Sequence, residues 1–253
     1  MITGYLYETH LHTSEVSACG KIRGADYVDY MISRGYNGMF VTDHFFNGNC
    51  AVDSRLDWKE RVDGFACGYR NALEAAAGKD FDVLFGIEFN FDGDEYLIYG
   101  VDIGWIKDND DITCVPRREV YHRVSQAKGI MIQAHPFRER SYLSDIKLTS
   151  DICDGIEVFN AGNTPNQNAL ALRYARKLGL PMTSGSDIHR QDDRAMGGMI
   201  LPQRIREPGE YVDAVRSGEA VPVRVYNGTV TKVTEIAEFM TRPDDPSFPV
   251  HYM

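Results

Sequence analysis

The stretch GADYVDYMISRGYNGMFVTDH (residues 24–44) contains a helical pattern followed at once by a short apolar strand. Apolar side chains recur at helical spacing up to Gly35, and glycine is typical just beyond a helix end. The run GMFVTDH (38–44) is rich in large and β-branched residues, as strands are. The earlier run YLYETH (5–10) has the same character. Residues 5–44 therefore predict a strand–helix–strand unit with parallel strands.

The same alternation continues along the chain. We expect further strands at 82–91, 95–102, 130–136, 155–160, 181–187 and 221–227, and further helices at 55–78, 116–128, 166–179 and 208–219. About seven such units in a chain of this length predict an α/β fold of the (β/α)7, TIM-like barrel type. An open doubly wound sheet is the alternative, but no GxGxxG motif follows the first strand. We expect one domain over residues 1–253, with 191–253 completing or capping the barrel.

Composition narrows the classes of partner. The net charge is −10 and the isoelectric point about 5.2, so we do not expect binding to duplex nucleic acid, although a small phosphorylated substrate remains compatible. No run approaches the roughly 20 apolar residues of a membrane span, and the N-terminus lacks the pattern of a secretory signal. The five cysteines are scattered, which favours a reducing cytoplasm. The oligomeric state stays open.

Histidines gather at the ends of the expected strands. Of seven histidines, five lie at or just past a strand C-terminus: His10, His12, His44, His135 and His189. In a parallel barrel these ends open on one face, where active sites lie. A single strand-end histidine is more often a satisfied core residue than a ligand. Their shared placement indicates a metal site.

Acidic residues share this placement. Glu88 and Glu157 lie inside apolar strands, where a carboxylate is costly unless it is paired or bound to a cation. Asp187 precedes His189 with the one-residue spacing of His10 and His12. Imidazole nitrogens with carboxylate oxygens suit zinc, manganese or iron. Glu157 could equally be a structural partner.

Together, the motifs HLH (10–12), VTDH (41–44), AHP (134–136) and DIH (187–189), with Glu88, resemble those of the PHP (polymerase and histidinol phosphatase) family. The resemblance covers about residues 5–190. It implies a distorted seven-stranded α/β barrel that holds two or three divalent zinc, manganese or iron ions. It also implies phosphoester hydrolysis.

The resemblance also implies a set of ligands. His10, His12, Glu88 and Asp187 would hold one ion, and Glu88 would bridge to a second ion held also by His135 and by Glu157 or Asn160. A third ion would use His44 and His189. The family's further His or Asp ligand is missing from HTSEVSACGK (12–21), where Cys19 is the nearest softer donor and Glu15 a weaker one. Cys19 could equally be a small buried thiol.

A mechanism follows as a hypothesis. Metals held by Glu88 and Asp187 would activate a water for in-line attack on phosphorus, and His44 or His189 would protonate the leaving alkoxide. Arg138, Arg190 and Arg23 are the candidate phosphate-binding residues, because a guanidinium matches two phosphate oxygens. Each could instead be a surface arginine.

We expect a histidinol-phosphatase-like enzyme that acts on a small phosphomonoester. A phosphodiesterase or short-oligonucleotide exonuclease is the alternative, with Phe45, Phe46 and Trp58 as possible stacking residues. An amidohydrolase is less favoured, since no lysine lies inside an expected strand. A non-catalytic metal-binding module is disfavoured by the near-complete ligand set.

Overall fold

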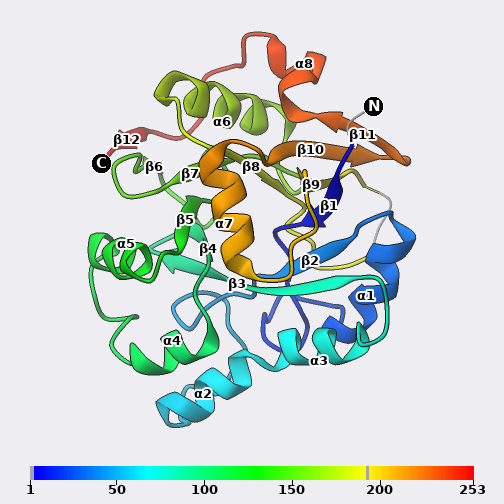
Figure 1. Cartoon of the computed structure of the whole chain (residues 1–253). Helices are drawn as coiled ribbons and strands as arrows, with labels where there is room; N and C mark the ends of the chain where they lie inside the picture. The colour runs from blue at the N-terminus through cyan, green and yellow to red at the C-terminus, as the bar shows by residue number, and fades with distance from the viewer. Residues whose placement is uncertain (1–2, 192–193) are drawn as a thin grey trace.

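A mixed, curled sheet forms the centre of the computed structural model, which describes residues 3–191 and 194–253 (Figure 1). Ten strands lie in the spatial order β11-β10-β9-β1-β2-β3-β4-β5-β7-β8, and β6 pairs with β12 in a separate sheet. The strands are β1 (Tyr5–Glu8), β2 (Gly38–Val41), β3 (Asp82–Phe91), β4 (Asp94–Tyr99), β5 (Ile130–Gln133), β6 (Ile146–Leu148), β7 (Gly155–Asn160), β8 (Met182–Gly185), β9 (Met196–Leu201), β10 (Val221–Tyr226), β11 (Thr229–Lys232) and β12 (Val250–Tyr252).

Most helices lie around the outside of this sheet, whereas α7 is seen across its middle (Figure 1). They are α1 (Gly24–Ser33), α2 (Trp58–Phe65), α3 (Cys67–Ala75), α4 (Ile103–Asp108), α5 (Arg117–Gln126), α6 (Pro165–Leu178), α7 (Pro208–Ser217) and α8 (Ala237–Met240), with a 3-10 turn at Val233–Glu235. Among the described residues, no helix has the length and apolar character needed to cross a membrane.

One apolar cluster fills the inside of the curl. Tyr7 of β1, Phe40 of β2 and Leu97 of β4 are buried in it together with Tyr211 of α7. The Tyr7 hydroxyl donates to Asp82 Oδ2 at the start of β3 (2.9 Å), which places this end of the core at the N-terminal ends of the strands. At the opposite ends, His10 and His12 follow β1, His44 follows β2 and His135 follows β5.

The α/β class agrees with the sequence, but the sheet is mixed rather than built of parallel βα repeats. β3 and β4 are antiparallel, β4 and β5 are antiparallel, and β9 runs antiparallel to β1 and β10. The turn between β3 and β4 contains Asp92 (φ 52°) and Gly93 (φ 95°), a pair of positive φ values that matches a type I′ hairpin. The run DGD (92–94) predicts a turn here, and the structure confirms it. This turn reverses the chain where a barrel repeat would cross over.

The predicted helix 55–78 is two helices, α2 and α3, which meet at Ala66. Asp57 and Glu60 form a capping box at the start of α2. In α3, Gly68 packs against the loop that follows β1, where an added Cβ would lie 2.1 Å from Thr13 Oγ1. The approach of Thr13 therefore requires glycine at this position.

Candidate metal centre

Backbone hydrogen bonds join the candidate ligand segments in pairs. His12 N donates to Ile188 O (3.0 Å), and Ile188 N donates to the carbonyl of His10 (3.2 Å). These two bonds hold the HLH and DIH motifs side by side. Glu88 N likewise donates to the carbonyl of Asp43 (3.1 Å). The ligand spacing is thus set by the backbone and not only by flexible side chains.

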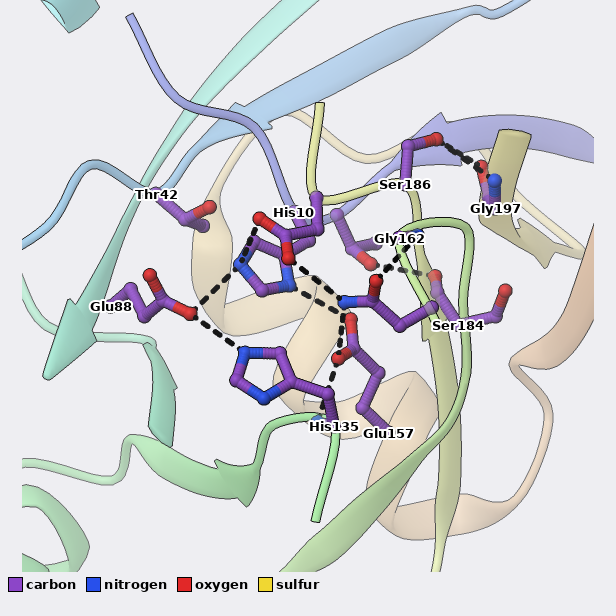
Figure 2. A network of polar contacts seen from close by, with 12 residues as sticks. His10, Thr42, Glu88, His135, Glu157, Gly162, Ser184, Ser186 and Gly197 are labelled. Carbon is purple, nitrogen blue, oxygen red and sulfur yellow. Dashed lines mark hydrogen bonds and ion pairs between the residues drawn. The ribbon is translucent and has the colours of Figure 1, made fainter. Parts of the chain in front are cut away.

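Side chains from five segments converge at this point. Glu88 is buried at the centre: its Oε1 lies 3.0 Å from His10 Nε2 and 3.2 Å from His135 Nε2, and its Oε2 lies 2.7 Å from His44 Nδ1. Figure 2 shows His10 and His135 pointing toward the carboxylate of Glu88. On the other side, His12 Nε2 lies 3.1 Å from Asp187 Oδ1.

Several polar atoms in this cluster have no hydrogen-bond partner among the described residues. They are His10 Nε2, His12 Nε2, His44 Nδ1 and Glu88 Oε2, all buried. Their short contacts with opposite charges are ion-pair distances that lack hydrogen-bond geometry. An unsatisfied buried polar atom costs about 1–3 kcal/mol, so four of them in one place need a compensating interaction. Imidazole nitrogens and carboxylate oxygens within 4.8 Å of one another also form triplets suited to a metal ion. The residues present therefore fit divalent transition metals.

Glu157 has a different place from the other acids. Its Oε1 lies 2.9 Å from His10 Nδ1, and its Oε2 accepts from the backbone N of His135 (2.9 Å) and from Asn160 Nδ2 (3.0 Å). Both oxygens are thus engaged by protein groups. A carboxylate behind a metal-binding histidine fixes the ring tautomer and raises its basicity. This geometry favours a positioning role for Glu157, the structural alternative expected from the sequence.

The pKa shifts of the clustered acids and histidines bear on cation binding. Burial alone would raise the pKa of Glu88, but His44 and His10 hold that pKa well below its usual range. Burial likewise works against ionised Asp187, yet Arg138 and His10 keep its pKa low. Burial, with His44 nearby, lowers the pKa of His12 to about 3. Glu88 and Asp187 are therefore ionised and His12 is neutral, which are the forms that bind metal. Burial works against protonated His10 and His44, yet the neighbouring carboxylates raise the pKa of both rings, so metal binding at these two histidines would release protons.

Two of the candidate ligands adopt backbone conformations that side chains rarely take. His135 has φ 28° and Asp187 has φ 52°. Such conformations cost on the order of 1–3 kcal/mol each and gather at functional sites, where the surrounding structure holds them. Asp187 is held by the neighbouring backbone bonds of Ile188, and His135 by the bond from its N to Glu157.

Two further buried carboxylates support the loops that carry the histidines. Glu8 Oε1 accepts from the backbone N of His10 (2.8 Å) and of Ser186 (2.9 Å). Asp43 accepts from Thr13 N (2.6 Å) and Ser17 Oγ (2.6 Å). Neither carboxylate points at the metal cluster. They bind backbone and hydroxyl donors, and so position the ligand segments.

A second group of histidines lies next to the first. His12, His44 and His189 offer nitrogens close enough for one ion, and the ring centroids of His12 and His189 are 4.3 Å apart. Cys19 lines the adjoining cavity with His44 and His189. Burial would raise the pKa of Cys19, but hydrogen bonds from His189 and His44 lower it to about 6. Cys19 is thus at the location that the sequence suggested for a third ion.

A cavity of about 670 Å³ opens over the cluster, and arginines line part of it. Arg138 Nη2 lies 2.6 Å from Asp187 Oδ2 and donates to Asn160 Oδ1 (2.8 Å), so this arginine braces a candidate ligand. Arg140 and Arg194 also line the cavity, although the sequence did not single them out.

The other two predicted arginines do not line this cavity. Arg190 is exposed and is absent from the cavity lining. Arg23 is exposed and forms two hydrogen bonds with Asp26, of 2.8 and 2.9 Å. The structure thus keeps Arg138 at the site and does not bring Arg23 there, because a local partner holds its guanidinium at the surface.

Glu95 is an acid at the site that sequence reasoning missed. It lines the cavity, and its carboxylate lies close to His44 and His135. The segment EYLIYGVD (95–102) predicts a strand that begins at Glu95, but this residue was not considered as a ligand. The available signal was the hairpin register, which pairs Glu95 with Asn90 two positions beyond Glu88.

Comparisons with known proteins concern the family and the fold of the chain. Residues 165–220 match a family model described as PHP-associated. No curated protein matches the chain. Among solved structures, the chain is similar to a two-domain protein from Bacteroides vulgatus described as containing a predicted PHP-like metal-dependent phosphoesterase. The identity is 14% and the TM-score 0.67, over 94% of this chain and 69% of that one.

Two other structures share the fold. An amidohydrolase from Chromobacterium violaceum with bound sulfate has 14% identity and a TM-score of 0.52, over 90% of this chain and 98% of that one. Endonuclease Q, in complex with a 27-mer duplex substrate, has 10% identity and a TM-score of 0.52, over 85% of this chain and 57% of that one. At these identities the structures establish the fold alone. With the family match, they confirm the resemblance to the PHP family.

Proposed function

We propose that this PHP-type chain is a metal-dependent phosphoesterase that hydrolyses a small phosphomonoester, as a histidinol phosphatase does. One observation carries the proposal: unpartnered donor atoms of His10, His12, His44 and Glu88 converge beneath a cavity lined by arginines. Donors of this type bind divalent transition metals, and guanidinium groups bind phosphate oxygens.

The proposed ligands for two ions are His10, His12, Glu88, His135 and Asp187. His44 and His189 are the proposed ligands for a third ion. Zinc, manganese or iron bound there would provide a nucleophile from water at neutral pH and neutralise charge on the phosphoryl oxygens. We assign Glu157 to orienting His10, because both of its oxygens are already engaged.

The remaining roles belong to groups that line the cavity. When no third ion is bound, His44 and His189 are the candidates to protonate the leaving alkoxide, since both reach the cavity and imidazole is an effective proton donor near neutral pH. Arg140 and Arg194 are better placed than Arg23 to contact a phosphate. Arg138 is committed to Asp187 and would act mainly by holding that carboxylate.

A single preparation tests the proposal. Metal content per chain is measured by elemental analysis, and the same sample is assayed with histidinol phosphate, nucleoside monophosphates, phosphotyrosine, a phosphodiester and an amide. We expect at least about two metal ions per chain and hydrolysis of a monoester. Fewer than one transition-metal ion per chain, in protein dialysed against zinc or manganese, would overturn the proposal.

A second candidate is hydrolysis of phosphodiester bonds in nucleic acid. The fold is shared with endonuclease Q, so the net charge of −10 is not enough to exclude a duplex partner. The cavity floor carries the acids Glu88, Glu95 and Asp187, which disfavours a long polyanion unless metals neutralise them. Hydrolysis of oligonucleotides without hydrolysis of monoesters would select this candidate.

A cytoplasmic location is part of the same proposal. All five cysteines are free, and each lies within the described residues. Free thiols are typical of a reducing compartment. Fractionation of cells that express the full chain tests this location.

A further inference from the structure

Two carboxylates face the same two imidazole nitrogens in the metal centre. His44 Nδ1 lies 2.7 Å from Glu88 Oε2 and 3.8 Å from Glu95 Oε1. His135 Nε2 lies 3.2 Å from Glu88 Oε1 and 3.4 Å from Glu95 Oε2. Each nitrogen is therefore shared between one oxygen of Glu88 and one oxygen of Glu95. The four side chains enclose a small space with nitrogen and oxygen donors on opposite sides.

The β3–β4 hairpin places Glu88 and Glu95 near each other. Glu88 and Glu95 lie on adjacent antiparallel strands, β3 and β4, whose register pairs Glu88 with Leu97 and Asn90 with Glu95. Asn90 Nδ2 lies 3.3 Å from Glu95 Oε1, so a neutral amide supports the carboxylate from the outer side. The side chain of Glu95 is 13% exposed and that of Glu88 is 1% exposed. Glu95 is therefore held in place rather than free in solvent.

The two carboxylates of Glu88 and Glu95 would be stabilised by a cation between them. Two carboxylates brought together in a buried position repel each other, and a buried charge is tolerated only when it is paired. Arg138 does not neutralise this pair, because its Nη2 lies 2.6 Å from Asp187 Oδ2. His44 Nδ1 and Glu88 Oε2 are 2.7 Å apart, but neither meets hydrogen-bond geometry with the other or with any further described residue. A divalent ion between the two carboxylates would satisfy all of these atoms.

We propose that Glu95 is a metal ligand, which contributes a second carboxylate to an ion held by Glu88, His44 and His135. In this assignment His44 belongs to the ion between the carboxylates and not to a third ion, because its Nδ1 faces Glu88 and Glu95. This inference rests on the proposed metal-dependent function and adds a residue to its metal centre. Two imidazoles with two carboxylates form a harder donor set than the all-histidine group of His12, His44 and His189. The set with Glu95 therefore favours manganese or iron(II) more strongly than the all-histidine group does.

Metal affinity distinguishes a Glu95 that binds the ion from a Glu95 that only hydrogen-bonds to a ligand. If Glu95 only oriented the ring of His135, its replacement by Gln would keep an acceptor oxygen and the ion would remain. If Glu95 is a ligand, Gln removes the charge that balances the ion, and affinity falls. Asp94 offers a matched control, because it is the neighbouring acid on β4 but forms an ion pair with Arg117 (2.5 Å).

The experiment measures metal binding without substrate. Wild type, E95Q, E95D and D94N are stripped with a chelator and checked for folding by circular dichroism. They are then titrated with Mn²⁺, with the bound equivalents counted by elemental analysis. We expect E95Q to lose one equivalent or to bind it more than about 100-fold more weakly, which exceeds the roughly 10- to 100-fold effect of residues outside the coordination sphere. E95D should retain partial binding and D94N should match wild type.

The outcomes separate the two proposals. If wild type binds no metal, the proposed function fails. If wild type and E95Q bind the same equivalents with the same affinity, only the role of Glu95 is overturned. If E95Q does not fold, a crystal structure of wild type soaked in Mn²⁺ decides the question. A Glu95 oxygen within coordination distance, roughly 2.0–2.3 Å, supports the inference, and a longer distance overturns it.

Discussion

Nδ1 of His10 lies 2.9 Å from Oε1 of Glu157, and the Nε2 atom of the same ring lies 3.0 Å from Oε1 of Glu88 (Figure 2). The imidazole thus connects a fully engaged carboxylate on one side with the proposed metal centre on the other. We predict that E157Q weakens metal binding by about 10- to 100-fold, because the amide cannot accept from His10, His135 and Asn160 together. Titration of the stripped protein with Zn²⁺ measures this. Unchanged affinity would show that Glu157 does not act through His10.

Glu88 is predicted to be the least replaceable acid of the site. Its two oxygens lie near the nitrogens of His10, His135 and His44, so E88Q removes the one carboxylate shared by all three. We expect this variant to lose at least one metal equivalent and most of its phosphatase activity. Elemental analysis and a rate assay on the same sample check both effects. Full metal content with full activity would falsify the ligand assignment.

Replacing Arg138 and replacing Arg23 should have different effects on folding stability. Replacing the buried Arg138 by Ala leaves Asp187 without its ion-pair partner, which we expect to cost about 3 kcal/mol of folding stability in the metal-free protein. Arg23 is 68% exposed and pairs with Asp26, so R23A should leave both stability and activity close to wild type. Urea unfolding of the stripped proteins, with a parallel activity assay, separates the two variants. Equal losses in both would contradict the placement of Arg138.

The sequence was enough to predict the α/β class and the segments that bring the histidines together. His10, His12, His44 and His135 follow apolar strands, and the ends of such strands meet on one face whether the sheet is a closed barrel or a curled one. The strand directions were harder to predict. β9 contains Gly197 and Gly198, which weaken its strand pattern, so its antiparallel pairing with β1 was not foreseen.

Side-chain orientation limited the prediction of the site. Whether Glu157 faces the metals or the back of His10 depends on which oxygen meets which donor, and strand alternation does not specify this. Glu95 was missed because its position comes from the β3–β4 register rather than from a motif. Arg23 follows the HLH motif in sequence, but Asp26 lies three residues away and holds it at the surface.

Gly185 allows His10 and Glu157 to approach the end of β8. A Cβ at this position would lie 2.4 Å from His10 Cβ and 2.9 Å from Glu157 Oε1. We predict that G185A displaces the ring of His10, destabilises the fold by about 3 kcal/mol and lowers metal affinity. Gly209, in α7, has no atom within 4 Å of an added Cβ, so G209A is a suitable control. Thermal unfolding with and without Zn²⁺ measures both effects, and equal behaviour of the two variants would contradict the close packing at Gly185.

Asp154, just before β7, should make stability depend on pH. Burial raises its pKa, an effect only partly offset by its hydrogen bond from the backbone N of Met131 (2.9 Å). An acid whose pKa is raised by folding binds its proton more tightly in the folded state. Its contribution to stability is therefore greatest at low pH and falls as the pH rises through the folded pKa.

D154N keeps an acceptor oxygen for Met131 but cannot ionise. We therefore expect the free energy of unfolding of wild type, relative to D154N, to decrease as the pH rises from 4 to 7. Urea unfolding of both proteins across this range measures the difference, and D108N, at an exposed aspartate, provides the control. A difference that stays constant or increases with pH would mean that burial does not control the ionisation of Asp154.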